Sequence, residues 1–461
     1  MQNVNRRSFF VTLAAASTGR AASERYPLKW KAVTGIENNG VVAGKIDGKV
    51  RLFVTGRMHY RNPPPLAGYL VSLDAAGHIL YKDRAHTGGI CVFPSFLEPK
   101  GVGPSVFYAC GPYQPDSVGE ARLVNAHDGR TRWTQPTSNQ FFGNGSCVLA
   151  DVDGDREEEL VYGDQAAVRC FRARDGKLKW FYNDRVVICH GRLAYGEINR
   201  DSRPELVFGT EYSNADKSSS MVAINGRGKV LWRKDGIAGD MGSTPAVLAD
   251  VDGDGRLEIL KVELDLLGRE KMPYAGLFCY RGDGTLKYRA DFGVSGMAVG
   301  DLDRDGSLEA VGISDGRDGG VNGRNEIRCL DLKTGKMKWT TPVPRAWLGS
   351  QDPVMADLTG DGRLNVLVSS SNPSGYGRRK GEEPYGDIYI VDGRGKIVWN
   401  TTLPDFVHQP FVSDIDGDGR NEIVLACHDG AIYCYGTPGK AGRLWSVTGG
   451  SFERTYKAEP L

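Results

Sequence analysis

The stretch Asp250-Val-Asp252-Gly-Asp254-Gly-Arg256-Leu-Glu258 is the clearest copy of the pattern that decides the fold. Apolar, strand-like segments flank this acidic stretch on both sides. Full copies of the pattern begin at Asp151, Asp250, Asp301 and Asp414, and eroded copies begin at Glu197 and Asp357. These six anchors are 46, 53, 51, 56 and 57 residues apart, which is a period typical of propellers and solenoids.

A second pattern runs in phase with the first and ends each unit. It is a glycine turn followed by an aromatic residue, as in Asp175-Gly176-Lys-Leu-Lys-Trp180. Counting both patterns gives eight units of about four strands each, so we predict an all-β, eight-bladed β-propeller of four-stranded blades. Seven blades are the alternative, because the first two units lack the acidic residues. Lys29-Trp30-Lys31 is expected to form an extra outer strand that helps to close the ring.

Composition restricts the class of partner. The 58 Lys and Arg residues nearly balance 57 Asp and Glu residues, and the net charge of +1 argues against nucleic-acid binding. Hydrophobic residues make up 40% of the 461 residues, which fits a globular chain with a sizeable core. The nine cysteines include no CxxC pair, so a zinc or redox motif is not indicated. A disulfide between Cys427 and Cys434 is left open.

The amino terminus reads as an export signal over residues 1–23. Asn5-Arg6-Arg7-Ser8-Phe9-Phe10 is followed by a short apolar run and small residues, which is the order of a signal peptide. The paired arginines favour the twin-arginine type, with an ordinary secretory signal as the alternative. We therefore expect one propeller domain over residues 24–461 in the periplasm or outside the cell. No later apolar run is long enough to predict a transmembrane segment.

These acidic repeats resemble the FG-GAP (VCBS-like) family, whose blades also occur in integrin α-chain propellers. The outer strands, such as Leu330-Asp331-Leu-Lys-Thr334-Gly335-Lys-Met-Lys-Trp339, resemble PQQ-type propeller repeats. The resemblance covers nearly the whole mature chain. It implies a propeller and calcium in the acidic loops, but it does not imply one activity, because such propellers serve adhesion, binding and catalysis.

The chemistry of the loops also favours calcium. Oxygens at positions 1, 3, 5 and 9, with a carbonyl at 7, suit a cation that accepts 6 to 8 oxygens. Asp-Gly turns without a metal are the alternative. We expect structural Ca²⁺, with the following ligands in the full copies: Asp151, Asp153, Asp155, Glu159, Asp250, Asp252, Asp254, Glu258, Asp301, Asp303, Asp305, Glu309, Asp414, Asp416, Asp418 and Glu422.

Strand alternation places the acidic loops and the glycine turns on one face, and the other connections on the opposite face. Aromatic and arginine side chains on that opposite face suit sugar rings and carboxylates. We expect a ligand there, most simply a carbohydrate, of which a polymer that contains uronate is one form, with a protein partner as the alternative. The predicted ligand-binding residues are His59, Arg61, Tyr212, Trp347, Tyr376 and Arg378.

An enzymatic alternative uses the same face. Calcium-rich propellers of this type resemble the rhamnogalacturonan lyases, and β-elimination needs a base and a cation beside the uronate. His190 or His408 is the candidate base, and Arg192 or Arg345 the candidate cation. No family catalytic motif is found, so whether the protein is an enzyme stays open. A quinoprotein dehydrogenase is disfavoured, because the sequence has no vicinal cysteine pair.

Overall fold

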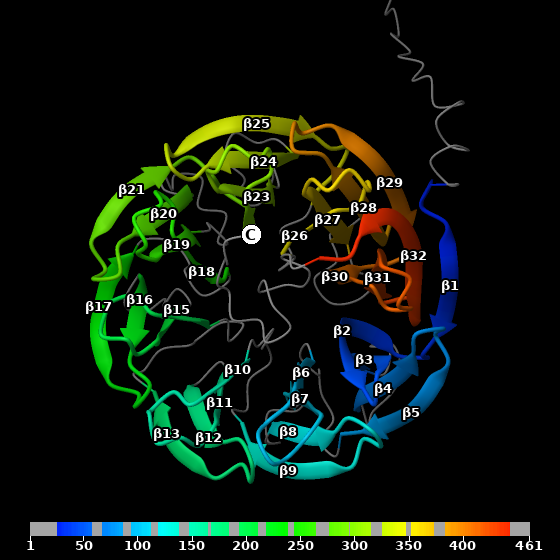
Figure 1. Cartoon of the computed structure of the whole chain (residues 1–461), viewed down its shortest axis with the longest axis horizontal. Coiled ribbons are helices and arrows are strands. Elements are labelled where there is room, and N and C mark those ends of the chain that lie inside the picture. Colours follow the sequence, from blue (N-terminus) through cyan, green and yellow to red (C-terminus); the bar gives the residue numbers. More distant parts are fainter. Residues whose placement is uncertain are drawn as a thin grey trace, which may run out of the picture.

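The fold is an eight-bladed β-propeller, shown by a computed structural model. The described residues are 25–57, 67–85, 94–111, 119–137, 147–164, 167–183, 193–210, 218–237, 244–263, 276–294, 296–314, 325–346, 352–372 and 383–442. They form 32 strands in eight four-stranded antiparallel sheets arranged as a ring (Figure 1). The prediction of eight four-stranded blades is confirmed, and the seven-bladed alternative is wrong.

Each blade contributes one strand to each of four concentric positions, A to D, from the channel outward. The A strands are β2 (Glu37–Ile46), β6 (Ser95–Leu97), β10 (Cys147–Ala150), β14 (Ala194–Gly196), β18 (Ala246–Ala249), β22 (Ala298–Gly300), β26 (Val354–Ala356) and β30 (Val407–Ser413). The B strands are β3 (Lys49–Arg57), β7 (Ser105–Cys110), β11 (Glu159–Gly163), β15 (Glu205–Gly209), β19 (Glu258–Glu263), β23 (Glu309–Ser314), β27 (Asn365–Asn372) and β31 (Arg420–Cys427).

The C strands are β4 (Gly68–Asp74), β8 (Glu120–Asn125), β12 (Val168–Arg172), β16 (Ser219–Ile224), β20 (Gly276–Tyr280), β24 (Glu326–Asp331), β28 (Tyr385–Val391) and β32 (Ala431–Lys440). The D strands are β5 (Ile79–Arg84), β9 (Thr131–Pro136), β13 (Leu178–Tyr182), β17 (Val230–Ile237), β21 (Leu286–Ala290), β25 (Lys336–Pro342), β29 (Ile397–Leu403) and β1 (Leu28–Val33). Blade 1 comprises β2 to β5, and the numbering continues to blade 8, which comprises β30, β31, β32 and β1.

The ring is closed by pairing the two ends of the described chain. Strand β1 lies antiparallel to β32, with Trp30 opposite Cys434 and Lys31 opposite Tyr433. Blade 8 therefore takes its outer strand from the start of the domain. Lys29-Trp30-Lys31 closes the ring as expected, but it is the fourth strand of blade 8 and not an extra one. The closure also covers the edge of β32, which would otherwise be free to pair with another chain.

Burial explains the sequence pattern of the strands. Every residue of β23 is buried, because a B strand is covered by the neighbouring blades on both faces. Strand β25 instead alternates between exposed and half-buried residues, as expected for an outer strand with one face in water. The chain therefore reads as continuous apolar runs in the inner strands and as mixed Lys-Trp segments in the outer ones.

Neighbouring blades are held together by the aromatic residue of each D strand. The indole of Trp180 donates a hydrogen bond to the Gly226 carbonyl at 2.9 Å and packs on Gly228 in the next blade. Gly228 has φ +74°, and a Cβ there would lie 2.8 Å from the indole. Trp30, Trp133, Trp232 and Trp339 make the same hydrogen bond to the next blade. This explains the aromatic and glycine pattern in the sequence.

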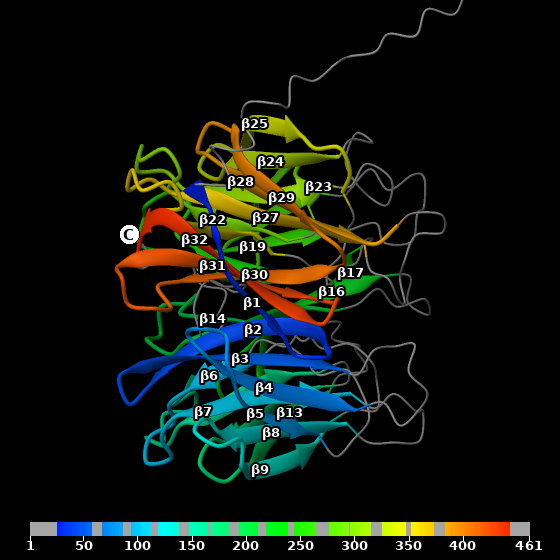
Figure 2. The same cartoon turned by 90° about the vertical axis from the view of Figure 1, so that its right-hand side faces the viewer.

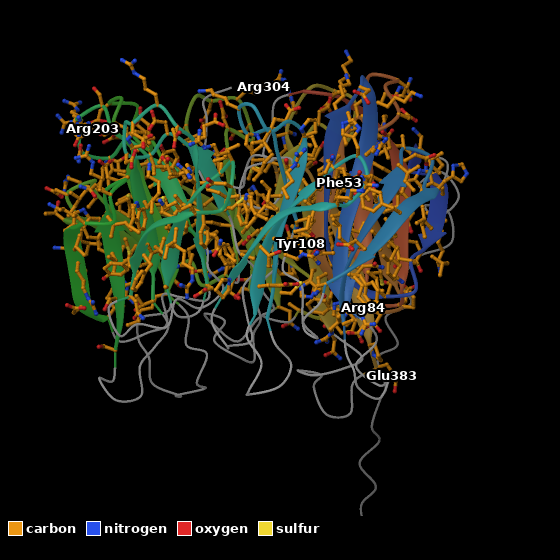
Figure 3. The ribbon with its side chains drawn as sticks, turned by 90° about the horizontal axis from the view of Figure 1, so that it is seen from below. Phe53, Arg84, Tyr108, Arg203, Arg304 and Glu383 are labelled. Carbon is orange, nitrogen blue, oxygen red and sulfur yellow. The ribbon has the colours of Figure 1, made fainter. Side chains whose placement is uncertain are left out.

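The A–B loops and the C–D turns share one face of the disc. Glu157 of an A–B loop accepts a salt bridge from Arg174 of a C–D turn at 3.0 Å. Figure 3 shows Arg203 and Arg304, both in A–B loops, on one side, and Arg84 and Glu383 on the other. Figure 2 shows the same disc edge-on, with the strands running between its two faces. We call the side of Arg84 and Glu383 the far face.

Candidate functional site

The acidic loops are built by carboxylates that accept hydrogen bonds from their own backbone. Asp151 accepts from the N–H groups of Gly154 and Arg156, both at 2.8 Å. At position 9, Glu159 Oε2 accepts from the N–H of Val152 at 3.0 Å and ties the loop to strand β11. The position-9 residue makes this bond in all six loops, including Asn365 to Leu358 at 2.9 Å. The position-9 residue therefore has a structural role that needs no metal.

Most of the predicted metal ligands come together. Thirteen of the sixteen fall in groups whose ligand oxygens lie within 4.8 Å of one another. Three predicted ligands fall outside these groups: Glu258, Asp305 and Asp418. The eroded loop of blade 4 contributes a group of its own, with Glu197, Asp201 and Glu205. The sequence spacing thus predicted the clustering of carboxylates well. It did not identify the cation that balances their charge.

A lysine lies inside the loop of blade 3. Lys179 Nζ lies 2.7 Å from Asp153 Oδ2, 2.6 Å from Asp155 Oδ2 and 2.9 Å from Glu159 Oε1. Burial acts to lower the pKa of Lys179, but the hydrogen bonds to these carboxylates outweigh it and raise that pKa. Burial raises the pKa of Glu159, and the ammonium opposes that rise. The sequence analysis missed this residue, although it stands directly before the docking Trp180.

The other three full loops hold a lysine in the same way. Lys287 lies 2.5 Å from Asp252 and 2.8 Å from Glu258, and Lys338 lies 2.7 Å from Asp303 and 2.9 Å from Glu309. Lys29 of β1 reaches Asp416 at 2.6 Å and Glu422 at 2.7 Å. In each of the four loops, oxygens that calcium needs are hydrogen-bonded to an ammonium. The residues as arranged therefore do not offer calcium an open set of ligands.

Within the part of the chain that the structure describes, the eroded loop of blade 4 has no such lysine among its contacts. Glu205 Oε1 instead accepts a hydrogen bond from the Asn199 amide at 2.8 Å. Burial is the main cause that raises the pKa of Glu205 to about 7, and the charges of Glu197 and Asp201 add to the rise. The neutral Asn199 amide thus stabilises the ionised form of Glu205 much less than a lysine stabilises the position-9 carboxylates of the full loops.

On the far face, Arg345 forms a rigid cationic platform at blade 7. Its Nε and Nη2 donate to the two oxygens of Asp387 at 2.7 and 3.0 Å, and its guanidinium lies 3.6 Å from the centre of the Tyr385 ring. The Asp387 side chain is 6% exposed but that of Arg345 is 41% exposed. Within the described residues, Nη1 donates no hydrogen bond, so it is available to an anionic group.

Three rings gather at the adjoining end of blade 8. The His408 ring lies 4.5 Å from Phe406 and 4.9 Å from His428, measured between centroids. His428 is buried and its backbone N–H donates to the Phe406 carbonyl at 2.9 Å, whereas His408 is half-buried. His408 lies at the start of β30, the A strand, and His428 directly follows β31, the B strand.

Strand β27 joins these two groups. Ser370 donates to the Arg345 carbonyl at 3.3 Å, and Ser371 exchanges hydrogen bonds with the backbone of Val407 at 3.3 and 3.2 Å. Successive strand residues point to opposite sides of a sheet, so the two serines hold one group on each side of the same strand end. We call this region the far-face corner: Arg345, Tyr385, Asp387, Phe406, His408 and His428.

The remaining predicted site residues lie outside the described residues. They are His190 and Arg192 among the catalytic candidates, and His59, Arg61, Tyr212, Trp347, Tyr376 and Arg378 among the ligand-binding candidates. Sequence reasoning missed Tyr385, Asp387 and Phe406 at the corner. An Asp or Tyr at the start of a C strand carries no pattern that would separate it from an ordinary strand residue.

Two protein families match parts of the chain. Residues 383–451 match the lambda-carrageenase beta-propeller domain, a stretch that contains five of the six corner residues. Residues 106–257 match the repeat family described as outer membrane protein assembly factor BamB. No curated protein matches the sequence at a significant level.

Among solved structures, the chain is similar to other propellers. Saccharomyces cerevisiae Sqt1 aligns with a TM-score of 0.55 and 11% identity over 90% of this chain and 98% of that chain. A europium-containing methanol dehydrogenase aligns with a TM-score of 0.55 and 11% identity over 91% of this chain and 94% of that chain. Rhamnogalacturonan lyase YesW aligns with a TM-score of 0.48 and 17% identity over 93% of this chain and 96% of that chain. The two likenesses with a TM-score of 0.55 show the fold alone.

Cysteines and apolar segments add two facts. Cys427 and Cys434 are both free and buried, so the pairing left open by the sequence is not formed, whereas Cys110 is disulfide-bonded. Within the described ranges, no helix is long and apolar enough to cross a membrane.

Proposed function

We propose that this protein is an exported propeller that binds an acidic polysaccharide at the far-face corner. The observation that carries the proposal is the Arg345 platform, which is oriented by Asp387 and Tyr385 and keeps Nη1 free within the described residues. A planar guanidinium fixed in this way suits a carboxylate or sulfate, because its N–H groups are already held in the geometry that such anions accept.

The rings beside the platform suit the rest of a sugar. His408 is half-buried and lies across the end of β27 from Arg345, so an oligosaccharide that crosses this strand end would meet a cation and an imidazole. Imidazole can donate or accept hydrogen bonds to hydroxyl groups. The match of residues 383–451 to a carrageenase propeller domain, by its name part of a polysaccharide-degrading enzyme, supports a polysaccharide ligand over a protein partner.

Lyase activity is the second candidate, and the histidine pair favours it. His408 is partly accessible and His428 lies behind it, an arrangement in which one imidazole takes a proton while the other orients it. Arg345 is a weaker candidate for the catalytic cation, because Asp387 already balances much of its charge. Binding therefore remains the first proposal, with β-elimination on a uronate as the alternative.

Neither candidate depends on calcium. Structural calcium is the expectation from the sequence, but lysines compete for the same oxygens in the full acidic loops, and these loops lie on the face away from the corner. Export by residues 1–23 also stays a prediction, since that segment lies outside the described residues.

Arg345→Lys tests the binding proposal without removing the charge that Asp387 needs. Lysine keeps one positive charge but loses the planar fork and the ring stacking, so we expect affinity for acidic polymers to fall roughly tenfold. Arg84→Lys is the matched control, because Arg84 lies on the same face at blade 1. Affinity is measured by isothermal titration with λ-carrageenan, polygalacturonate, rhamnogalacturonan and neutral dextran.

The outcomes separate the candidates. Binding of acidic but not neutral polymers, lost in Arg345→Lys and kept in Arg84→Lys, supports the proposal. Equal affinity of both variants, or no binding to any acidic polymer, refutes it. Unsaturated uronate absorbance that rises with wild-type protein and disappears in His408→Ala favours the lyase instead.

A further inference from the structure

We propose that Lys29, Lys179, Lys287 and Lys338 are built-in cations that replace a metal ion in the four full acidic loops. Each ammonium contacts the position-9 carboxylate and at least one aspartate of its loop. The inference concerns the face opposite the polysaccharide site and does not rest on the proposed function.

The contacts of Lys179 show why a metal is excluded. An ammonium has three N–H donors, and Lys179 places oxygens of Asp153, Asp155 and Glu159 within 2.9 Å. Those oxygens point into the loop, while the second oxygen of each carboxylate accepts from a backbone N–H. Calcium at the centre would need the same inward oxygens and would lie a few Å from the ammonium, where two cations repel strongly.

Blade 8 shows that the lysine occupies the same place in the blade even when it comes from a distant part of the sequence. Its outer strand is β1, so Lys29 comes from the opposite end of the described chain, 387 residues from Asp416 and 393 from Glu422. The lysine still occupies the place directly before the docking aromatic, here Trp30. A lysine supplied by a separate strand at the equivalent place indicates that the acidic loop itself requires it.

Blades 4 and 7 provide the internal comparison. At the place of the lysine they have Leu231 and Val398, and among the six acidic loops theirs are the two that lack the full set of ligand positions. In blade 7 the position-9 carboxylate is replaced by Asn365, which still holds the Leu358 N–H. Lysine is thus present in the four full loops and absent from the two eroded ones, where an asparagine stands at position 3 (Asn199) or at position 9 (Asn365).

The inference gives a reciprocal prediction for calcium. With the lysines in place, the loops bind no calcium that stabilises the fold. Removing one ammonium leaves three or four converging carboxylates without a counter-charge, and such a set binds Ca²⁺ in oxygen-rich loops. Lys179→Met should therefore create a calcium site where the wild-type chain has none.

The test compares the purified mature chain with Lys179→Met and with Lys177→Met, an exposed lysine two residues earlier on the same turn. Thermal unfolding is recorded in chelator and in excess CaCl₂, and calcium binding is titrated directly. We expect wild type and Lys177→Met to melt at one temperature in both buffers. Lys179→Met should melt lower in chelator and recover in calcium, with one additional bound ion.

Several results would overturn the inference. Calcium that binds tightly within the four full loops of the wild-type protein shows that a metal and not lysine balances the charge of those loops. If Lys179→Met melts at the wild-type temperature in chelator, the ammonium does not stabilise the loop. If calcium does not restore the lowered melting temperature of Lys179→Met, the ion cannot take the place of the ammonium. If Lys179→Met does not fold, Lys338→Met and the wild-type titration decide the question.

Discussion

The contact between Trp180 and Gly228 gives a sharp test of how the blades are joined. In Gly228→Ala the new Cβ would lie 2.8 Å from the indole, so the ring must shift and its 2.9 Å hydrogen bond to Gly226 weakens. Overpacking of this kind costs about 1–3 kcal/mol. Alanine at φ +74° adds about 1 kcal/mol for the left-handed backbone. The expected loss in the free energy of unfolding is therefore about 2–4 kcal/mol.

Gly154→Ala is the matched control. Gly154 has φ +80° but nothing lies within 4 Å of its Cβ position, so this variant carries only the backbone cost of about 1 kcal/mol. Calorimetry should resolve the two, since a chain of this length shifts its melting temperature by about 1 °C per kcal/mol. In a Trp180→Ala background the cost of Gly228→Ala should fall to that of the control. Equal costs at both glycines in the wild-type background would refute the docking account.

Two further predictions follow from the loops and the ring closure. Because the folded pKa of Glu205 is raised from 4.5 to about 7, its proton stabilises the fold fully below pH 4.5, and that contribution is lost as the pH rises through 7. Glu205→Gln should match wild type near pH 4.5 and be more stable at pH 8, by at most about 3 kcal/mol in chelator-treated urea melts; an unchanged pH profile would contradict the assigned burial. Deleting the chain through Val33 removes β1 and exposes the β32 edge, so the truncated protein should aggregate or elute as oligomers in size-exclusion chromatography, whereas a chain that starts at Arg25 should remain monodisperse.

The repeat made most of the fold predictable from the sequence. Acidic anchors fix the A–B loops, and the aromatic before each blade boundary fixes the D strands, so strand order and the two faces follow by alternation. Even the closing strand was evident, because Trp30 is the same docking residue as Trp180. Blade number was ambiguous because blades 1 and 2 have lost the acidic residues and keep only Tyr81 and Trp133 as markers.

The candidate sites were predictable only in part, for two physical reasons. The spacing of Asp151 to Glu159 brings carboxylates together, but it does not show what neutralises them, and Lys179 lies 20 residues from Glu159 on another strand. The sequence did contain a signal for these lysines, because each blade with a full acidic loop has a lysine directly before its docking aromatic residue. At the far-face corner, Asp387 accepts a hydrogen bond from Arg345, which is 42 residues away in the sequence, and no local sequence pattern predicts such a pair.

A crystal structure with a bound acidic oligosaccharide tests the central claim most directly. The account predicts a carboxylate or sulfate of the ligand against Arg345 Nη1, with the sugar extending across the end of β27 toward His408. Ligand bound among the A–B loops on the opposite face, or contacting neither residue while the protein binds the polymer in solution, would contradict it.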